Sequence, residues 1–513
     1  MIRRRLLIGT LSNGAGKLIA SAAWFVLTPI MLRFLGSDAF ALWSLVGAIA
    51  AYGMLLEHGF GGAVIKYVAE HTARGERAAA REIVVTAVWL YAGLAAIAIL
   101  LSAALAPVLP PLLNIEPADY SSAAWLIALT GLNMACAIAF TPASAVLRGL
   151  HRYDLHNALF AFNSITEALL VAAVLFSGGG LIAMMIAFVA ANLLSGATSV
   201  ALVARVAPDL RLGLRGASRE AFRRLALFST ALFPIEAGRR LQSRADGFVI
   251  AAVQGLAGVT PFALARRLAE LCELAAIQFV RVVLPVASEL HACNDAARLR
   301  QLYLVSSRIA IAIATPVAVI LMFMGPLILT WWVGAEYAQY GHLVALLAIA
   351  TLLGASQWPA AEVLLGMARP RVVAISACVS GIANIVLSIL LLSRYGLTGV
   401  AVSAVVTMAI ASLGVVVPTA NRVLQVSLST MLREVWAPPG AAGAAAALVL
   451  WGSAGLGPAG SLFILAARVA ASTVVYAAVY LVMPAPTSER RLLKDGWGAV
   501  RAFPRLISIR ATQ

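Results

Sequence analysis

The stretch IVVTAVWLYAGLAAIAILLSAALAPVL, residues 83–109, decides the fold class, because it runs for 27 residues without a charge. A helix needs about 20 predominantly apolar residues to cross the hydrocarbon core of a membrane. Similar stretches recur along the whole chain: 62% of its 513 residues are hydrophobic and 12% are charged, with a mean hydropathy of +0.93. Soluble domains carry about 25% charged residues. The sequence therefore predicts an all-α integral membrane protein.

Apolar runs bounded by glycine, proline or charged residues predict about fourteen transmembrane helices. The runs cover residues 5–33, 39–61, 82–109, 121–147, 157–177, 181–204, 223–253, 259–288, 304–333, 341–365, 372–393, 397–420, 437–454 and 459–483. The loops expected on the outer side are short, and the longest runs from Pro110 to Tyr120. No catalytic constellation lies in these loops, so we expect no enzyme activity, no catalytic residue and no cofactor.

The distribution of basic residues predicts the orientation of the chain. With a cytoplasmic N-terminus, most Lys and Arg residues lie in cytoplasmic segments, and only Arg33 and Arg394 lie in outer loops. Basic residues accumulate in cytoplasmic loops of membrane proteins, so both termini are expected in the cytoplasm. This placement accounts for the net charge of +16 without a nucleic-acid partner. The basic tail is expected to attract anionic lipid head groups.

The two halves of the chain repeat each other at offsets that drift from 222 to 216 residues. The matches are Phe40-Ala41-Leu42 with Phe262-Ala263-Leu264, Gly36 with Gly258, Lys17 with Arg239, Gly149 and Arg152 with Gly366 and Arg369, and Gly180-Leu181 with Gly396-Leu397. They predict two six-helix lobes related by a pseudo-two-fold repeat, plus two extra C-terminal helices. Parallel repeats of this kind place substrate between the lobes.

This repeat divides the chain into five predicted segments. They are an N-lobe at 1–206, a basic cytoplasmic linker at 207–222, a C-lobe at 223–425, two appended helices at 430–485 and a basic cytoplasmic tail at 486–513.

Charged residues inside predicted spans require an explanation, because each is costly in hydrocarbon. The cations are Lys17 in the first span, Arg239, Arg240 and Arg244 in the seventh, and Arg266 and Arg267 in the eighth. Arginine binds phosphate well because its planar fork donates paired hydrogen bonds, so these cations are candidates for a substrate-binding lining. The alternative interpretation is internal ion pairing that locks the two helices together.

The acids in these spans are candidates for coupling transport to protons. They are Glu236, Asp246, Glu270 and Glu273, with Glu57 beside His58, Glu167 and Glu362 as further candidates. Salt bridges or positions near span ends explain most of them equally well. The four cysteines, Cys136, Cys272, Cys293 and Cys378, are scattered singly, so neither a metal site nor a disulfide framework is predicted.

Six motifs resemble a known family. Three occur in the first half, FLGSDAFALWSL (34–45), LLEHGFGGAVIKYVAEH (55–71) and LRGLHRYDLHNAL (147–159). Three occur in the second half, RADGFVIAAVQGLAGVTPFALARRL (244–268), GPLILTWWVGAEY (325–337) and RYGLTGVAVSAVVT (394–407). In this order they resemble bacterial Wzx-type polysaccharide flippases of the multidrug/oligosaccharidyl-lipid/polysaccharide exporter superfamily.

The resemblance implies transport of an undecaprenyl-diphosphate-linked oligosaccharide from the cytoplasmic to the periplasmic leaflet of the bacterial inner membrane. It further implies alternating access around a cationic cavity, with membrane lipids and other polysaccharide-assembly membrane proteins as partners. Two alternatives stay open at this point. One is a cation-coupled multidrug exporter of the same superfamily, and the other is a membrane enzyme such as a polysaccharide polymerase or ligase.

Overall fold

The structure of the protein is a computed structural model that describes residues 22–56, 60–210, 212–213, 215–230, 233–454 and 462–483. Across these ranges the regular secondary structure is helical. The candidate residues Lys17, Glu57 and His58, and the tail 486–513, lie outside the described residues.

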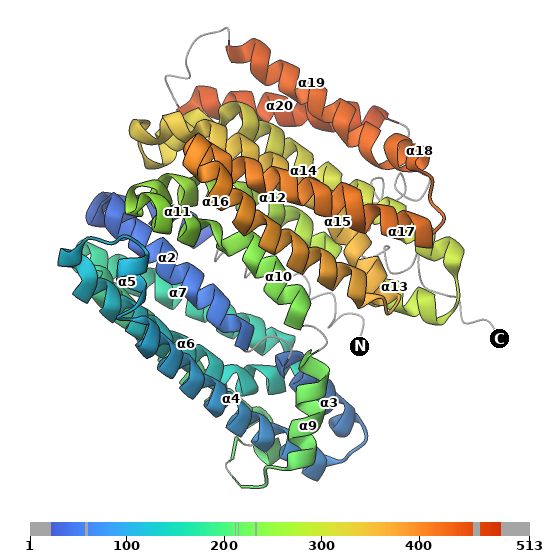
Figure 1. Ribbon diagram of the computed structural model, residues 1–513. Coiled ribbons are helices and arrows are strands. Elements are labelled where there is room, and N and C mark those ends of the chain that lie inside the picture. Colours follow the sequence, from blue (N-terminus) through green and yellow to red (C-terminus); the bar gives the residue numbers. More distant parts are fainter. Residues whose placement is uncertain are drawn as a thin grey trace. The chain divides into compact units, whose positions relative to one another are not determined.

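The chain divides into two compact units, Met1–Thr260 (unit 1) and Pro261–Gln513 (unit 2), which are described separately (Figure 1). After the helix Ala22–Leu35, unit 1 contains α2 (Ser37–Gly53), η1 (Met54–Leu56), α3 (Phe60–Ala73), α4 (Arg77–Leu105), α5 (Leu109–Leu112), η2 (Pro117–Asp119), α6 (Tyr120–Gly149), α7 (Tyr153–Phe176), α8 (Leu181–Val206), η3 (Pro208–Leu210), α9 (Arg219–Thr230), α10 (Phe233–Arg244), α11 (Asp246–Gln254) and η4 (Leu256–Gly258).

Unit 2 begins within the first turn of α12 (Val259–Val280). It continues with α13 (Val283–Ala292), α14 (Ala296–Val333), η5 (Ala335–Tyr340), α15 (Gly341–Gly366), α16 (Pro370–Ala409), η6 (Ile410–Val416), α17 (Val417–Val423), α18 (Leu428–Thr430), η7 (Met431–Trp436), α19 (Ala437–Ala454) and α20 (Leu462–Val482).

The predicted all-α membrane fold is confirmed. In the described part of the chain, nine helices are long and apolar enough to cross a membrane, and each of the fourteen predicted spans overlaps helical backbone. The stricter count is lower for several reasons. The first span is described only from Ala22 onward, helix α2 has only 17 residues, α12 carries four charges and the seventh span is broken. The two spans on either side of Gly396 are counted as one.

The sequence repeat has a structural counterpart at the ends of α6 and α15. The Arg152 N–H donates to the Leu147 carbonyl and the Arg369 N–H donates to the Leu364 carbonyl, both at 2.9 Å. The residue before each arginine is left-handed, with φ of 57° and 56°. Such a turn satisfies carbonyls that have no partner within the helix. The two turns are 217 residues apart. The fourth predicted span of each repeat, which is α6 in the first and α15 in the second, therefore ends in the same way.

A close helix contact is repeated at the same two places. A Cβ atom on Gly149 would lie 2.9 Å from the Val68 side chain in α3, and one on Gly366 would lie 2.7 Å from the Ala287 side chain in α13. Only glycine allows helices to approach so closely. Each unit therefore packs the end of a long helix against a short helix that the span pattern did not predict separately.

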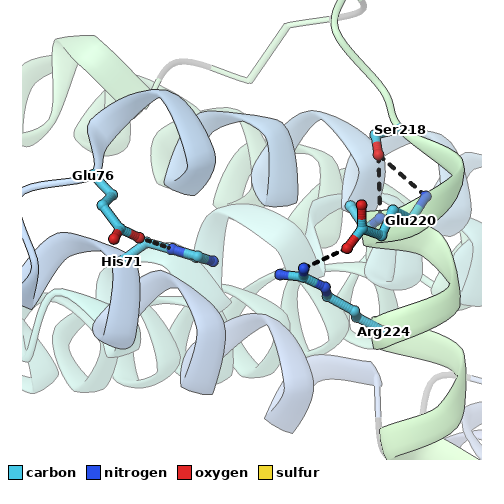
Figure 2. A network of polar contacts seen from close by, with 6 residues as sticks. His71, Glu76, Ser218, Glu220 and Arg224 are labelled. Carbon is cyan, nitrogen blue, oxygen red and sulfur yellow. Dashed lines mark hydrogen bonds and ion pairs between the residues drawn. The ribbon is translucent and has the colours of Figure 1, made fainter.

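The linker and the seventh predicted span fold onto unit 1. The Ser218 hydroxyl accepts two backbone N–H groups of the first turn of α9 (Figure 2). Glu220 pairs with Arg224 one turn later, and His71 contacts Glu76 at 2.7 Å where α3 leads into α4. Helix α9 packs on α3 and α4, and α10 and α11 pack on α2. The chain therefore divides at Thr260, later than the predicted linker at 207–222.

The last helices of unit 2 are interrupted and then continue. Gly396 has φ 58° and ψ −148° and breaks α16 between two predicted spans. Two π-helical segments follow, η6 and η7. The appended pair α19 and α20 lie side by side (Figure 1), and both pack on α14 through a cluster that includes Val319, Leu450 and Tyr476.

Candidate functional site

The seventh predicted span, residues 223–253, is built from three helices, α9, α10 and α11. Pro234 is the second residue of α10, where proline fits because first-turn amides have no partner within the helix. A bend at Ala245 separates α10 from α11. Arg244 therefore lies in the last turn of α10 and Asp246 in the first turn of α11. Each charge has the sign that its helix end favours.

Arg240 connects α10 to the end of α2. Its Nε atom donates to Glu236 Oε1 at 3.1 Å, and its Nη1 atom donates to the carbonyl of Ala51 at 2.5 Å. Ala51 lies in the last turn of α2, where carbonyls lack partners within the helix. The Tyr52 hydroxyl donates in turn to the Arg240 carbonyl at 3.3 Å. For this arginine the structure shows ion pairing and a helix-end contact.

The charged residues of this segment lie around the side chain of Tyr52. Its ring centroid lies 6.0 Å from that of Phe248, and its hydroxyl interacts electrostatically with Asp246, Arg244 and Arg240. Asp246 is only 2% exposed. The helix break at Ala245 thus brings one buried acid and two arginines to the end of α2.

The remaining cations of the seventh span are placed differently. The side chains of Arg239 and Arg244 are exposed, whereas the side chain of Arg240 is 20% exposed. Of the three arginines predicted for the substrate lining in this span, Arg240 is therefore ion-paired within unit 1, whereas Arg239 and Arg244 are exposed.

In unit 2, the charges of α12 lie on one side of the helix. Leu264, Leu268 and Cys272 are fully buried, while the predicted site residues are partly or fully exposed. These are Arg266, Arg267, Glu270 and Glu273. The Arg266 guanidinium lies over the Phe262 ring, 5.8 Å from its centroid, an arrangement that stabilises a cation.

A second polar group, which the sequence analysis identified only in part, joins α6, α7 and α8. Asn163 Nδ2 donates to Glu167 Oε1 at 2.9 Å. Asn192 Nδ2 donates to Asn133 Oδ1 at 2.9 Å and reaches Glu167 Oε1 at 3.5 Å. We call these four residues the amide–carboxyl cluster. The missed signal was the asparagine near the middle of each apolar span.

Unit 2 contains a neutral polar cluster between the two halves of α16. The Ser403 hydroxyl donates to Asn384 Oδ1 at 3.1 Å and lies 2.6 Å from the Ser388 hydroxyl. The Thr407 hydroxyl lies 3.3 Å from Asn384 Oδ1. All four residues are at most 1% exposed. We call them the amide–hydroxyl cluster, and it links the two spans on either side of Gly396.

Arg308 in α14 is an intramembrane cation that the sequence analysis did not single out. It is 1% exposed, and its Nε atom donates to the Tyr480 hydroxyl at 3.2 Å. Its Nη1 atom donates to the carbonyl of Glu434 at 3.3 Å, which lies in the π-helical segment η7. This arginine ties the appended helix α20 to α14 and η7.

The comparisons with known proteins agree with this architecture. The family model described as "Polysaccharide biosynthesis protein" matches residues 6–291. No curated protein sequence matches the chain.

Solved structures share the fold at low sequence identity. The lipid II flippase MurJ, in an inward closed conformation, is 12% identical with a TM-score of 0.73, covering 92% of this chain and 97% of its own. An inward-facing multidrug resistance MATE family transporter of the MOP superfamily is 14% identical with a TM-score of 0.68, covering 82% and 98%. A MOP superfamily transporter from Pyrococcus furiosus, also 14% identical, has a TM-score of 0.56 and covers 82% and 95%.

Proposed function

Because the chain belongs to the polysaccharide biosynthesis protein family, we propose that it flips an undecaprenyl-diphosphate-linked oligosaccharide from the cytoplasmic to the periplasmic leaflet of the bacterial inner membrane. The fold that it shares with MOP-superfamily transporters and with a lipid II flippase supports a transport role. The mechanism proposed is alternating access of the two repeats to the two sides of the membrane.

The observation that carries the substrate class is the sorting of charges on α10. Arg240 is held by Glu236 and by the end of α2, so it is assigned to the scaffold. Arg239 and Arg244 on the same helix are exposed residues. Guanidinium groups donate paired hydrogen bonds to phosphate oxygens, so these two are proposed to bind the diphosphate.

Arg266 and Arg267 on α12 are proposed as the corresponding contacts in unit 2. Lys17, which the repeat pairs with Arg239, remains a proposed member of the same binding site. A cationic lining fits an anionic lipid carrier better than it fits a cationic drug, because like charges repel the drug.

The test is a charge-removal series in cells, with Arg239→Ala and Arg244→Ala as the key variants. Each is scored for surface polysaccharide, lipid-linked intermediate and membrane abundance. A lost charge-assisted hydrogen bond of about 1.5–3 kcal/mol lowers transport by about tenfold or more. We therefore expect less polysaccharide and accumulated intermediate at normal abundance.

The matched control is Arg394→Ala, which removes an exposed arginine from a predicted outer loop. It is expected to leave polysaccharide unchanged. Full polysaccharide in both key variants would place the diphosphate site elsewhere. Normal polysaccharide combined with new drug sensitivity on deletion of the whole protein would favour a multidrug exporter instead.

A further inference from the structure

We propose that one exposed face of α9, formed by Arg219, Phe222, Arg223 and Leu227, binds an anionic phospholipid of the cytoplasmic leaflet. The lipid is a bound partner of this helix and not the transported substrate. The inference therefore goes beyond the proposed function, and it concerns a helix that carries none of the proposed diphosphate contacts.

The sequence of α9 brings two cations and two large apolar side chains to the same face. Arg219, Phe222 and Arg223 follow the spacing i, i+3 and i+4, and Leu227 lies one turn after Arg223. Residues at these spacings are neighbours on the surface of a helix. Both arginines are exposed, and Phe222 and Leu227 are 47% and 63% exposed. Basic and apolar residues that alternate on an exposed face are typical of helices that lie at a membrane surface.

The opposite side of α9 fixes its depth. Ala221 and Leu225 are 3% and 0% exposed and belong to the core cluster that includes residues of α3 and α4. Just before α9, the Ser218 N–H donates to the Thr86 hydroxyl at 3.1 Å. Thr86 is the fourth residue of the charge-free stretch 83–109, so α9 begins about 5 Å inside that stretch. Interfacial helices insert their apolar residues to about this depth.

The positive charge of the exposed face is not cancelled within the protein. Arg224 pairs with Glu220, and Figure 2 shows it pointing toward His71 of α3. In the part of the chain that the structure describes, neither Arg219 nor Arg223 forms an ion pair. The single acid of α9 is therefore engaged by the third arginine, and the other two remain available to an external anion.

An anionic lipid fits this face better than a free phosphate ion does. Guanidinium groups donate paired hydrogen bonds to phosphate oxygens, which both ligands offer. Only a lipid also covers Phe222 and Leu227 with acyl chains. The cytoplasmic leaflet attracts basic segments through its negative surface charge, and the distribution of basic residues predicts that the linker lies on that side. The face therefore matches a phosphate head group with acyl chains beside it.

The test localises the lipid with a photoreactive phosphatidylglycerol whose diazirine lies next to the head group. The full-length protein is reconstituted in phosphatidylcholine nanodiscs that contain this probe, irradiated, and analysed by peptide mass spectrometry. The wild type is expected to be labelled on α9. The double variant Arg219→Ala/Arg223→Ala is expected to lower this labelling by about thirtyfold, since each basic residue near an anionic surface contributes about fivefold.

Two further variants control for charge and for folding. Arg369→Ala/Arg371→Ala removes two exposed arginines from another predicted cytoplasmic loop and is expected to leave the labelling of α9 unchanged. Arg219→Lys/Arg223→Lys keeps both positive charges and is expected to retain most of the labelling. Melting curves of all variants show that they are folded, and added phosphatidylglycerol should raise the unfolding temperature more in the wild type than in Arg219→Ala/Arg223→Ala.

Three results overturn the proposal. The first is equal labelling of α9 in the wild type and in Arg219→Ala/Arg223→Ala. The second is equal labelling of α9 by a phosphatidylcholine probe with the same photoreactive group. The third is labelling that disappears in sodium phosphate but not in sodium chloride of equal ionic strength, which assigns the face to a free phosphate ion. The assay contains no oligosaccharide and scores no transport, so its outcome is separate from that of the proposed function.

Discussion

Arg240 shows how an arginine can be kept in an apolar segment by the protein itself. Its guanidinium group satisfies both the Glu236 carboxylate and a carbonyl at the end of α2. The positive charge also lies at the negative end of the α2 dipole. These contacts join two helices whose residues are almost 190 positions apart in sequence.

We expect Arg240→Ala to destabilise the protein. Its removal leaves a partly buried carboxylate and a helix-end carbonyl without their donor, at a cost of about 1.5–3 kcal/mol. Thermal unfolding of the detergent-solubilised protein measures the loss, and membrane abundance should fall with it.

Arg394→Ala is the control, because removal of an exposed arginine from a predicted outer loop should leave the unfolding temperature unchanged. A stable but inactive Arg240→Ala variant would contradict the scaffold role and return this arginine to the substrate site.

Residue spacing predicted part of this arrangement. The pairing of Glu236 with Arg240 follows from their separation by one helical turn. The contact of Arg240 with Ala51 could not be predicted, because it depends on how α10 packs on α2. For the same reason the sequence identified Glu167 as a candidate acid but not its partners Asn133 and Asn192, which come from other helices.

At the scale of helices, the repeated contact of α6 with α3 and of α15 with α13 is the most constrained packing feature. Both contacts require glycine, since Gly149 and Gly366 each meet a neighbouring helix at less than 3 Å from a hypothetical Cβ. By contrast, a Cβ on Gly93 in α4 would meet no atom within 4 Å.

Gly149→Ala and Gly366→Ala are therefore expected to lower the unfolding temperature, because the added methyl group pushes a short helix away and overpacking costs about 1–3 kcal/mol. Gly93→Ala should stabilise the protein slightly, since alanine is favoured over glycine in helices by about 1 kcal/mol. Parallel melting curves of the three variants test this ranking. Equal curves for all three would show that α3 and α13 yield without cost.

Helix boundaries were predictable where a local breaker marks them. Gly396 separates two predicted spans and has the left-handed conformation that only glycine adopts readily. The short helix α3 was not predicted, because its charged residues end the apolar run at residue 61. Helix α13 was not separated from the span expected at 259–288, which overlaps it. The break at Ala245 carries no glycine or proline, so the seventh span was expected to be one helix.

At the scale of the whole molecule, the predicted topology remains to be tested by reporter fusions. Alkaline phosphatase, which folds only where disulfides form, should be active when fused after Asn114 and inactive when fused after Arg77. A fluorescent protein at the C-terminus should fold in the cytoplasm. Reversed activities would contradict the orientation derived from the basic residues.

The duplication was readable from the sequence, since the offset of 217 recurs in the capped turns at His151 and Ala368. The lobe boundary in the linker at 207–222 stays a prediction. In the structure α9, α10 and α11 pack on elements of unit 1, which ends at Thr260. Composition can identify a linker. It does not show on which unit the next helix packs, because that depends on how the side chains of the two surfaces fit together.

The amide–hydroxyl cluster has a consequence for the way the chain enters the membrane. Its residues lie on the two spans on either side of Gly396 and are hydrogen-bonded to one another. A polar group left without a partner in hydrocarbon costs several kcal/mol. The two spans are therefore expected to insert together as a hairpin, because each supplies the partners of the other's polar groups.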